Sequence, residues 1–337
     1  MSNKIIKNIK PLGMQWETLD PFLFCAHHLD LYPAGNDQLG PAVPLDGRNI
    51  GQDFAGKDGW NMYHGNIVPG FPAHPHRGFE TVTIVTKGLV DHSDSLGATG
   101  RFGNGDVQWL TSGRGVQHSE MFPLLNKDSN HFELFQLWLN LPGKSKMAEP
   151  HYKMLWRDEI PKIIKNDSSG NKTTIDLIAG FYEDQKSLEP TPDSWAADAE
   201  NEVQIWLLKM DGNAQFEIPV AKDGVNRALY FYDGESLTIS GTEIKSKQMI
   251  ELNPQNEIII KNSSKPASIM FLQGRPINEP VVQYGPFVMN SQEEIQQTMR
   301  DYQSTQFGGW PWPRADHVHE KDKGRFAIHA NGKEEIK

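Results

Sequence analysis

Two short motifs place pairs of metal-binding side chains two residues apart. The first is His-Pro-His at residues 74–76, and the second is His-Ser-Glu at residues 118–120. On a β-strand this spacing points both side chains to the same face of the sheet. Three imidazoles and one carboxylate suit a transition metal such as iron, manganese, nickel, copper or zinc. The two motifs thus offer His74, His76, His118 and Glu120 as candidate ligands.

Neither motif is decisive alone, because the chain contains 12 histidines and a solvated or packed pair is the commoner case. Pro75 removes a backbone donor between the first two histidines, which indicates a strand start or an edge strand. Glu80 shares the parity of these histidines and is a further candidate ligand. Taken together, the motifs predict a metal site whose carboxylate is Glu120 or Glu80.

The elements that carry these motifs are predicted to be short strands, since long helical periodicity is scarce. β-branched residues and alternation predict strand structure over residues 79–90, with a turn at Lys87-Gly88. Further strands are expected at 106–110, 132–141, 203–210, 227–232, 236–239, 257–260 and 268–272. One helix is expected at 291–302, where Ser291 and Glu294 form a capping-box pattern. The fold class is therefore expected to be all-β.

A chain of 337 residues is long enough for two domains, and 37% hydrophobic with 23% charged residues is typical of a globular protein. The polar composition of residues 160–200 predicts the boundary between two halves. The tail after Phe307 is rich in Gly, Pro and charge, and is expected to wrap the surface or to be loosely ordered.

The charge and composition exclude several classes of partner. A net charge of -10 argues against direct binding of nucleic acid, which needs a basic surface. The single cysteine, Cys25, cannot form an intramolecular disulfide and suits a reducing compartment. Neither a signal peptide nor an apolar run of about 18 residues is visible, so no membrane partner is expected. The prediction is a cytoplasmic protein.

Longer strings around the motifs resemble the pirin family of the cupin superfamily. They are HPHRGFETVT at 74–83, GDVQW at 105–109, GRGVQHSEM at 113–121 and EPVVQYGPFVMN at 279–290. The similarity extends from about residue 20 to about residue 305. The string GGWPWP at 308–313 looks like an extension carried by some bacterial relatives.

The resemblance implies a bicupin, with two antiparallel β-barrels and a short C-terminal helix. The expected ranges are a metal-binding barrel at 1–165, a second barrel at 166–305 and an extension at 306–337. The implied metal is iron, held in the N-terminal barrel by His74, His76, His118 and Glu120, whereas the general cupin pattern would use Glu80. No histidine occurs between His151 and His317, so the second barrel is expected to lack such a site.

The same resemblance implies quercetin 2,3-dioxygenase activity, in which O2 opens the central ring of a flavonol with loss of carbon monoxide. Glu120 would then be a fourth ligand or the base that takes the flavonol's hydroxyl proton. The alternative is a metal-dependent redox sensor that binds a transcription factor or a metabolic enzyme. A third reading is a metal that only stabilises the barrel. A monomer is expected in each case.

Three weaker signals each have two interpretations. His64 and Phe79 could line the mouth of the site or be ordinary packed residues. Arg77 could attract an anionic substrate or form a structural ion pair. Trp310 and Trp312 could bind a partner or pack against the body of the protein.

Overall fold

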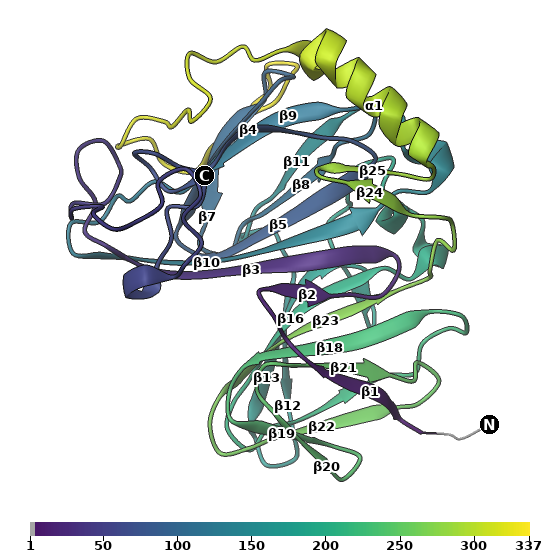
Figure 1. The fold of residues 1–337 in the computed structure, drawn as a ribbon. Coiled ribbons are helices and arrows are strands. Elements are labelled where there is room, and N and C mark those ends of the chain that lie inside the picture. Colours follow the sequence, from purple (N-terminus) through teal and green to yellow (C-terminus); the bar gives the residue numbers. More distant parts are fainter. Residues whose placement is uncertain (1–3) are drawn as a thin grey trace. The chain divides into compact units, whose positions relative to one another are not determined.

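The computed structural model describes residues 4–337, and the chain divides into two compact units. The first barrel comprises Ala26–Arg157 and Glu279–Lys337. The second barrel comprises the residues up to Cys25 together with Asp158–Asn278. Both are built almost entirely from antiparallel strands, so the predicted all-β class with a short C-terminal helix is confirmed (Figure 1).

This division differs from the expected ranges of 1–165, 166–305 and 306–337. The start of the chain belongs to the second barrel, because β1 (Ile6–Pro11) pairs with β21 (Gln248–Leu252). The polar stretch expected at the boundary contains two paired strands of that barrel, β12 (Lys162–Asn166) and β13 (Lys172–Ala179). Residues 279–337 return to the first barrel, including the expected extension.

Two sheets form the first barrel, with the strand orders β11-β8-β5-β10-β3 and β27-β26-β7-β6-β9-β4. The bounds of their strands are β3 (Phe22–Pro33), β4 (Gly70–His76), β5 (Phe79–Lys87), β6 (Leu89–Asp94), β7 (Thr99–Gly103), β8 (Val107–Thr111), β9 (Val116–Met121), β10 (Ser129–Asn140), β11 (His151–Leu155), β26 (Phe326–Ile328) and β27 (Glu334–Ile336). The predicted turn at Lys87-Gly88 joins β5 to β6. We refer to the second of these sheets as the ligand sheet, because it carries both histidine motifs.

The predicted helix is α1 (Gln292–Thr305), and its capping box is formed. The Ser291 side chain accepts a hydrogen bond from the Glu294 backbone N–H, and the Glu294 carboxylate accepts one from the Ser291 backbone N–H. Ile295 packs against Phe287 of the hairpin β24 (Val282–Tyr284) and β25 (Phe287–Met289). Helix and hairpin both belong to the first barrel.

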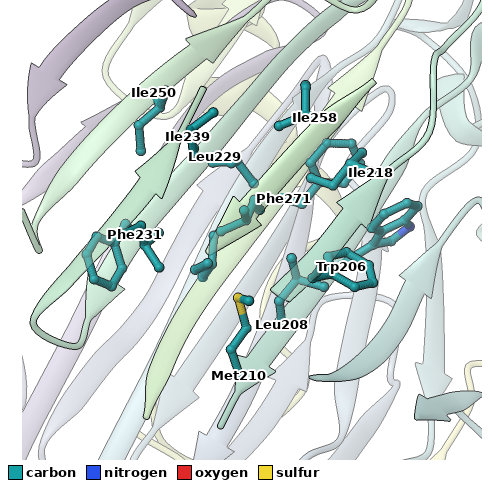
Figure 2. Packing of buried hydrophobic residues seen from close by; sticks show 14 of the residues in the cluster. Trp206, Leu208, Met210, Ile218, Leu229, Phe231, Ile239, Ile250, Ile258 and Phe271 are labelled. Atoms are coloured by element: carbon teal, nitrogen blue, oxygen red, sulfur yellow. The ribbon is translucent and has the colours of Figure 1, made fainter. Parts of the chain in front are cut away.

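The interior of the second barrel is filled by apolar side chains. On β16 (Gln204–Met210) alternate residues point inward, because a strand repeats every two residues (Figure 2). They meet apolar side chains such as Leu229 and Phe271, and all of these are almost completely buried. The remaining strands of this barrel are β2 (Gln15–Glu17), β14 (Phe181–Tyr182), β15 (Gln185–Lys186), β17 (Gln215–Ile218), β18 (Asn226–Asp233), β19 (Ser236–Ile239), β20 (Thr242–Lys245), β22 (Ile258–Asn262) and β23 (Ala267–Gly274).

Short 3-10 turns complete the secondary structure. They are η1 (Lys57–Gly59), η2 (Gly143–Ser145), η3 (Trp195–Ala197), η4 (Ala199–Asn201) and η5 (Gln306–Gly308). Within residues 4–337, no helix combines the length and the apolar character needed to cross a membrane.

Candidate metal centre

The neighbouring strands β4 and β9 bring the two histidine motifs together. Their antiparallel register places His74 directly opposite His118. The ring centroids of His74 and His76 are 4.8 Å apart, those of His74 and His118 are 4.5 Å apart, and those of His76 and His118 are 4.8 Å apart. One ring nitrogen from each histidine lies within 4.8 Å of the others. The side chains therefore converge on one small volume.

The hydrogen bonding of these rings fits a metal ion. His74 Nδ1 lies 2.9 Å from the carbonyl oxygen of Pro72, which can only accept, so Nδ1 carries the proton and Nε2 keeps a free lone pair. Within residues 4–337, the buried ring nitrogens of His118 have no hydrogen-bond partner, and those of His76 meet only the backbone of Pro286. Buried polar atoms without partners are rare, and a shared cation bound through one nitrogen of each ring would account for one such atom on each of these two histidines.

Burial keeps the three imidazoles neutral. It lowers the pKa of His74 to about 4, and it holds the pKa of His76 and of His118 well below the usual value. Neighbouring imidazoles lower the pKa of each ring further, because like charges would repel. Metal binding requires the neutral imidazole, so the cluster is prepared for it near neutral pH.

Glu120 lies beside the three histidines but is held by other contacts. Its Oε2 is 3.6 Å from Nε2 of His118. The amide of Gln136 donates to both carboxylate oxygens, at 3.0 and 2.8 Å, and the hydroxyl of Thr83 donates to Oε1 at 3.2 Å. Burial raises the pKa of Glu120, and these hydrogen bonds lower it in part. The carboxylate is thus anchored with one oxygen close to the histidine cluster.

Glu80 lies on the opposite face of its strand from the side chains that approach the cluster. Phe79 packs on His76 and Thr83 contacts Glu120, so the odd-numbered residues of β5 face the centre. The Glu80 carboxylate instead accepts hydrogen bonds from the Trp109 indole and the Thr111 hydroxyl, at 3.1 and 2.7 Å. The geometry favours Glu120 over Glu80 as the carboxylate of the site.

The parity argument for Glu80 is wrong because the chain turns between the two strands. Gly78 separates β4 from β5 and has a φ of 86°, in the left-handed region that glycine tolerates. A Cβ atom at this position would lie 2.0 Å from the carbonyl oxygen of Val288. Two residues of the same parity on either side of such a turn need not share a face.

Sequence reasoning missed the residues that support the centre from the facing sheet and from β6. Thr83 and Gln136 hold Glu120, and Gln136 interrupts the otherwise apolar run of residues 134–139, which was the available signal. His92 and Asp94 on β6 are fully buried and lie opposite Glu120 and His118 in the register. Their side chains pair with each other at 3.2 Å.

Among the residues with two interpretations, one lies at the proposed metal site and two make structural contacts. Phe79 lies against the centre, with its ring centroid 5.0 Å from that of His76. Arg77 forms a structural ion pair with Asp301 at 2.7 Å. Trp312 packs on the first barrel, and its indole N–H donates to the backbone oxygen of Asp94.

An aromatic surface extends from His74 towards the exterior of the first barrel. The ring of Phe71 lies 6.3 Å from that of His74 and stacks at 5.1 Å on Tyr63. The exposed rings of Phe54 and His64 continue this surface, 5.1 Å from each other. His64 therefore belongs to the surroundings of the site, as one interpretation of the sequence expected.

The antiparallel β-barrel fold places this chain in the cupin superfamily, and histidines from two adjacent strands meet inside its first barrel. Family models match this chain at residues 7–139, described as Pirin, and at residues 205–308, described as the Pirin C-terminal cupin domain. The chain belongs to the pirin family.

Similar proteins support this assignment. A Pirin-like protein of Solanum lycopersicum is 39% identical over 69% of this chain and 75% of its own length. A Pseudomonas aeruginosa protein named as a candidate quercetin 2,3-dioxygenase is 38% identical over 70% of this chain and 80% of its own length. The crystal structure of a quercetin 2,3-dioxygenase from Acinetobacter baumannii is 28% identical, with a TM-score of 0.67 over 90% of this chain and 96% of that chain.

The lowered pKa values of the histidines predict an acid-sensitive metal-free protein. An ordinary histidine titrates near pH 6.5 and His74 near pH 4, so the unfolded chain binds more protons than the folded chain between these values. Stability is therefore fully present above about pH 6.5 and is lost as the pH falls towards 4. We expect the melting temperature of metal-free protein to fall by about 5 °C between pH 7 and pH 5.

The His74→Gln variant provides the comparison for this titration. It lacks one of the buried imidazoles, so its melting temperature should depend less steeply on pH over the same window. The melting temperatures are measured by thermal unfolding in the presence of a chelator. If they depended equally steeply on pH in the two proteins, the lowered pKa of His74 would be contradicted.

Proposed function

We propose that the protein is a metal-dependent dioxygenase that opens the ring of a flavonol-like aromatic substrate with O2. The observation that carries this proposal is the convergence of three neutral imidazoles, two of them buried with unpartnered nitrogens, beside one anchored carboxylate. Support also comes from the similarity to a solved quercetin 2,3-dioxygenase.

The ligands in this proposal are His74, His76, His118 and Glu120, and the metal is iron(II). Manganese, nickel, copper or zinc would also suit three imidazoles and one carboxylate. A redox-active metal in this place would supply a Lewis acid that holds substrate and oxygen together. The protein contributes the hydrogen bond from His74 to Pro72, which fixes the tautomer and ring orientation of that ligand.

Glu120 would act as the base towards the 3-hydroxyl group of the flavonol. The substrate O–H bond breaks and the proton moves to a carboxylate oxygen of Glu120. Burial raises the pKa of this carboxyl, which makes it a better proton acceptor than a solvated glutamate. Gln136 and Thr83 hold the carboxylate in position during the transfer.

The aromatic surface would bind the planar substrate. Flat π-systems pack on one another in offset-stacked or edge-to-face arrangements. Phe71 lies next to His74, and Phe54 and His64 extend the surface outward. Cleavage of the substrate then incorporates both atoms of O2 into the products and releases one ring carbon as carbon monoxide.

The test is anaerobic mixing of the iron-loaded protein with quercetin, followed by admission of oxygen. We expect a shift of the flavonol absorption that requires the metal, because the hydroxyl is deprotonated in the site. Oxygen should then be consumed with release of carbon monoxide, measured with an oxygen electrode and by gas analysis. Protein treated with a chelator is the control.

Two outcomes would overturn the enzymatic proposal. Iron-loaded protein that gives neither the shift nor turnover would contradict flavonol cleavage. If the iron-loaded protein instead bound a protein partner with different affinity in the iron(II) and iron(III) states, a redox-sensing function would replace the proposed dioxygenase activity.

A further inference from the structure

Residues 309–337 form a C-terminal arm that lies beyond both matched family ranges, the second of which ends at residue 308. The arm follows α1 and ends in the hairpin β26–β27 beside β7 (Figure 1). It belongs to the first barrel and contacts four strands of the ligand sheet, which are β4, β6, β7 and β9.

At one edge of the ligand sheet, the arm contacts the strand that carries two histidines. The pairing of β4 with β9 is interrupted between Phe71 and His74. Ala73, within this interruption, donates its backbone N–H to the carbonyl oxygen of Ala315 at 2.8 Å. The arm thus provides a backbone partner immediately before the first proposed ligand.

In the middle of the sheet, the arm contacts the strand next to His118. The indole N–H of Trp312 donates to the backbone oxygen of Asp94 at 2.8 Å, and Asp94 lies opposite His118 in the register of β6 and β9. His317 stacks on Trp312, with ring centroids 5.3 Å apart. This contact fixes the Trp312 ring over β6.

Towards the opposite edge of the ligand sheet, β26 pairs with β7, and the arm covers the buried guanidinium group of Arg101. Arg101 on β7 is completely buried and forms a two-point ion pair with Asp91, at 2.6 and 2.8 Å. Its guanidinium also donates to the carbonyl oxygens of His319, Glu320 and Lys323, at 3.1, 2.9 and 2.8 Å. The arm therefore satisfies donors that would otherwise lack protein partners.

We propose that the C-terminal arm preorganises the metal site by holding the ligand sheet at β4, β6 and β7. Ligand atoms must stay within about 0.5 Å of the productive geometry for tight binding. An edge strand with an interrupted ladder is free to move unless another segment holds it, and the arm holds it at Ala73. This inference rests on the metal binding proposed above.

The test measures nickel(II) affinity by competition with a chromophoric chelator. The full chain is compared with a chain that ends at Gly308, which keeps α1 and Phe307. We expect the shortened chain to bind nickel at least about tenfold more weakly, because β4 loses its partner at Ala315. Circular dichroism checks that both chains are folded.

A matched pair of tryptophan substitutions keeps the test decisive if the shortened chain does not fold. Trp312→Phe removes the hydrogen bond to Asp94, whereas Trp310→Phe removes a hydrogen bond to Arg314 within the arm itself. One hydrogen bond corresponds to about a fivefold change, so Trp312→Phe should weaken nickel binding by up to that factor and Trp310→Phe should leave it unchanged.

The possible outcomes distinguish a failure of the proposed metal site from a failure of the proposed role of the arm. Failure of the full chain to bind nickel would contradict the proposed ligands. Normal binding by the full chain, with equal affinity in the shortened chain or in both tryptophan variants, would overturn the role of the arm alone.

Discussion

Replacing His118 with alanine is expected to lower nickel(II) affinity by at least about 100-fold. Structural metal sites contribute about 10–16 kcal/mol, and an equal share among four ligands is about 3 kcal/mol, or roughly two orders of magnitude. His118 is completely buried between the other two histidines and Glu120, so no solvent-exposed group can take its place. Chelator competition measures the change.

His92→Ala is the matched control for this substitution. His92 is also completely buried, and its ring centroid lies 5.6 Å from that of His118, but it is not part of the three-histidine cluster. Its side chain pairs with Asp94 and stacks on Tyr152. We expect lower thermal stability with nickel affinity within about tenfold of the original. An equal loss of nickel in both variants would contradict the ligand set.

The strands with strong local patterns could be predicted from the sequence, whereas their long-range partners could not. β5 is rich in β-branched residues, and α1 starts at a recognisable capping box. β12 is only five residues long and lacks a fully buried residue, and the polar run that follows it at 166–172 resembles a linker. The pairing of β1 with β21 joins residues more than 200 positions apart, and no local pattern encodes that contact.

At the metal centre, too, the local spacing could be predicted from the sequence, whereas the contacts between distant strands could not. Spacing alone identified the three histidines, because both motifs lie on strands and the period of two applies within each strand. The same rule misplaced Glu80, because the turn at Gly78 resets the faces between β4 and β5. Gln136 is brought to Glu120 by the facing sheet, which the sequence around either residue does not reveal.

Replacing Glu120 with glutamine is expected to lower the turnover of quercetin by about 10²- to 10⁴-fold, the usual contribution of a general base. The amide keeps the shape of the side chain but cannot accept the hydroxyl proton. Because the three histidines remain and the glutamine carbonyl oxygen can still coordinate, we expect nickel affinity to fall by only about tenfold, less than an equal share of a lost ligand. Oxygen uptake divided by the amount of bound metal separates loss of chemistry from loss of metal.

Glu80→Gln is the matched control, since Glu80 is an equally buried carboxylate on the face of β5 that points away from the histidines. Its carboxylate accepts from the Trp109 indole and the Thr111 hydroxyl, so the amide should cost about 1–3 kcal/mol of stability. Turnover per bound metal should stay within a few-fold of the original, because these contacts lie away from the histidines. The opposite pattern, with turnover lost in Glu80→Gln and kept in Glu120→Gln, would assign the catalytic carboxylate to Glu80.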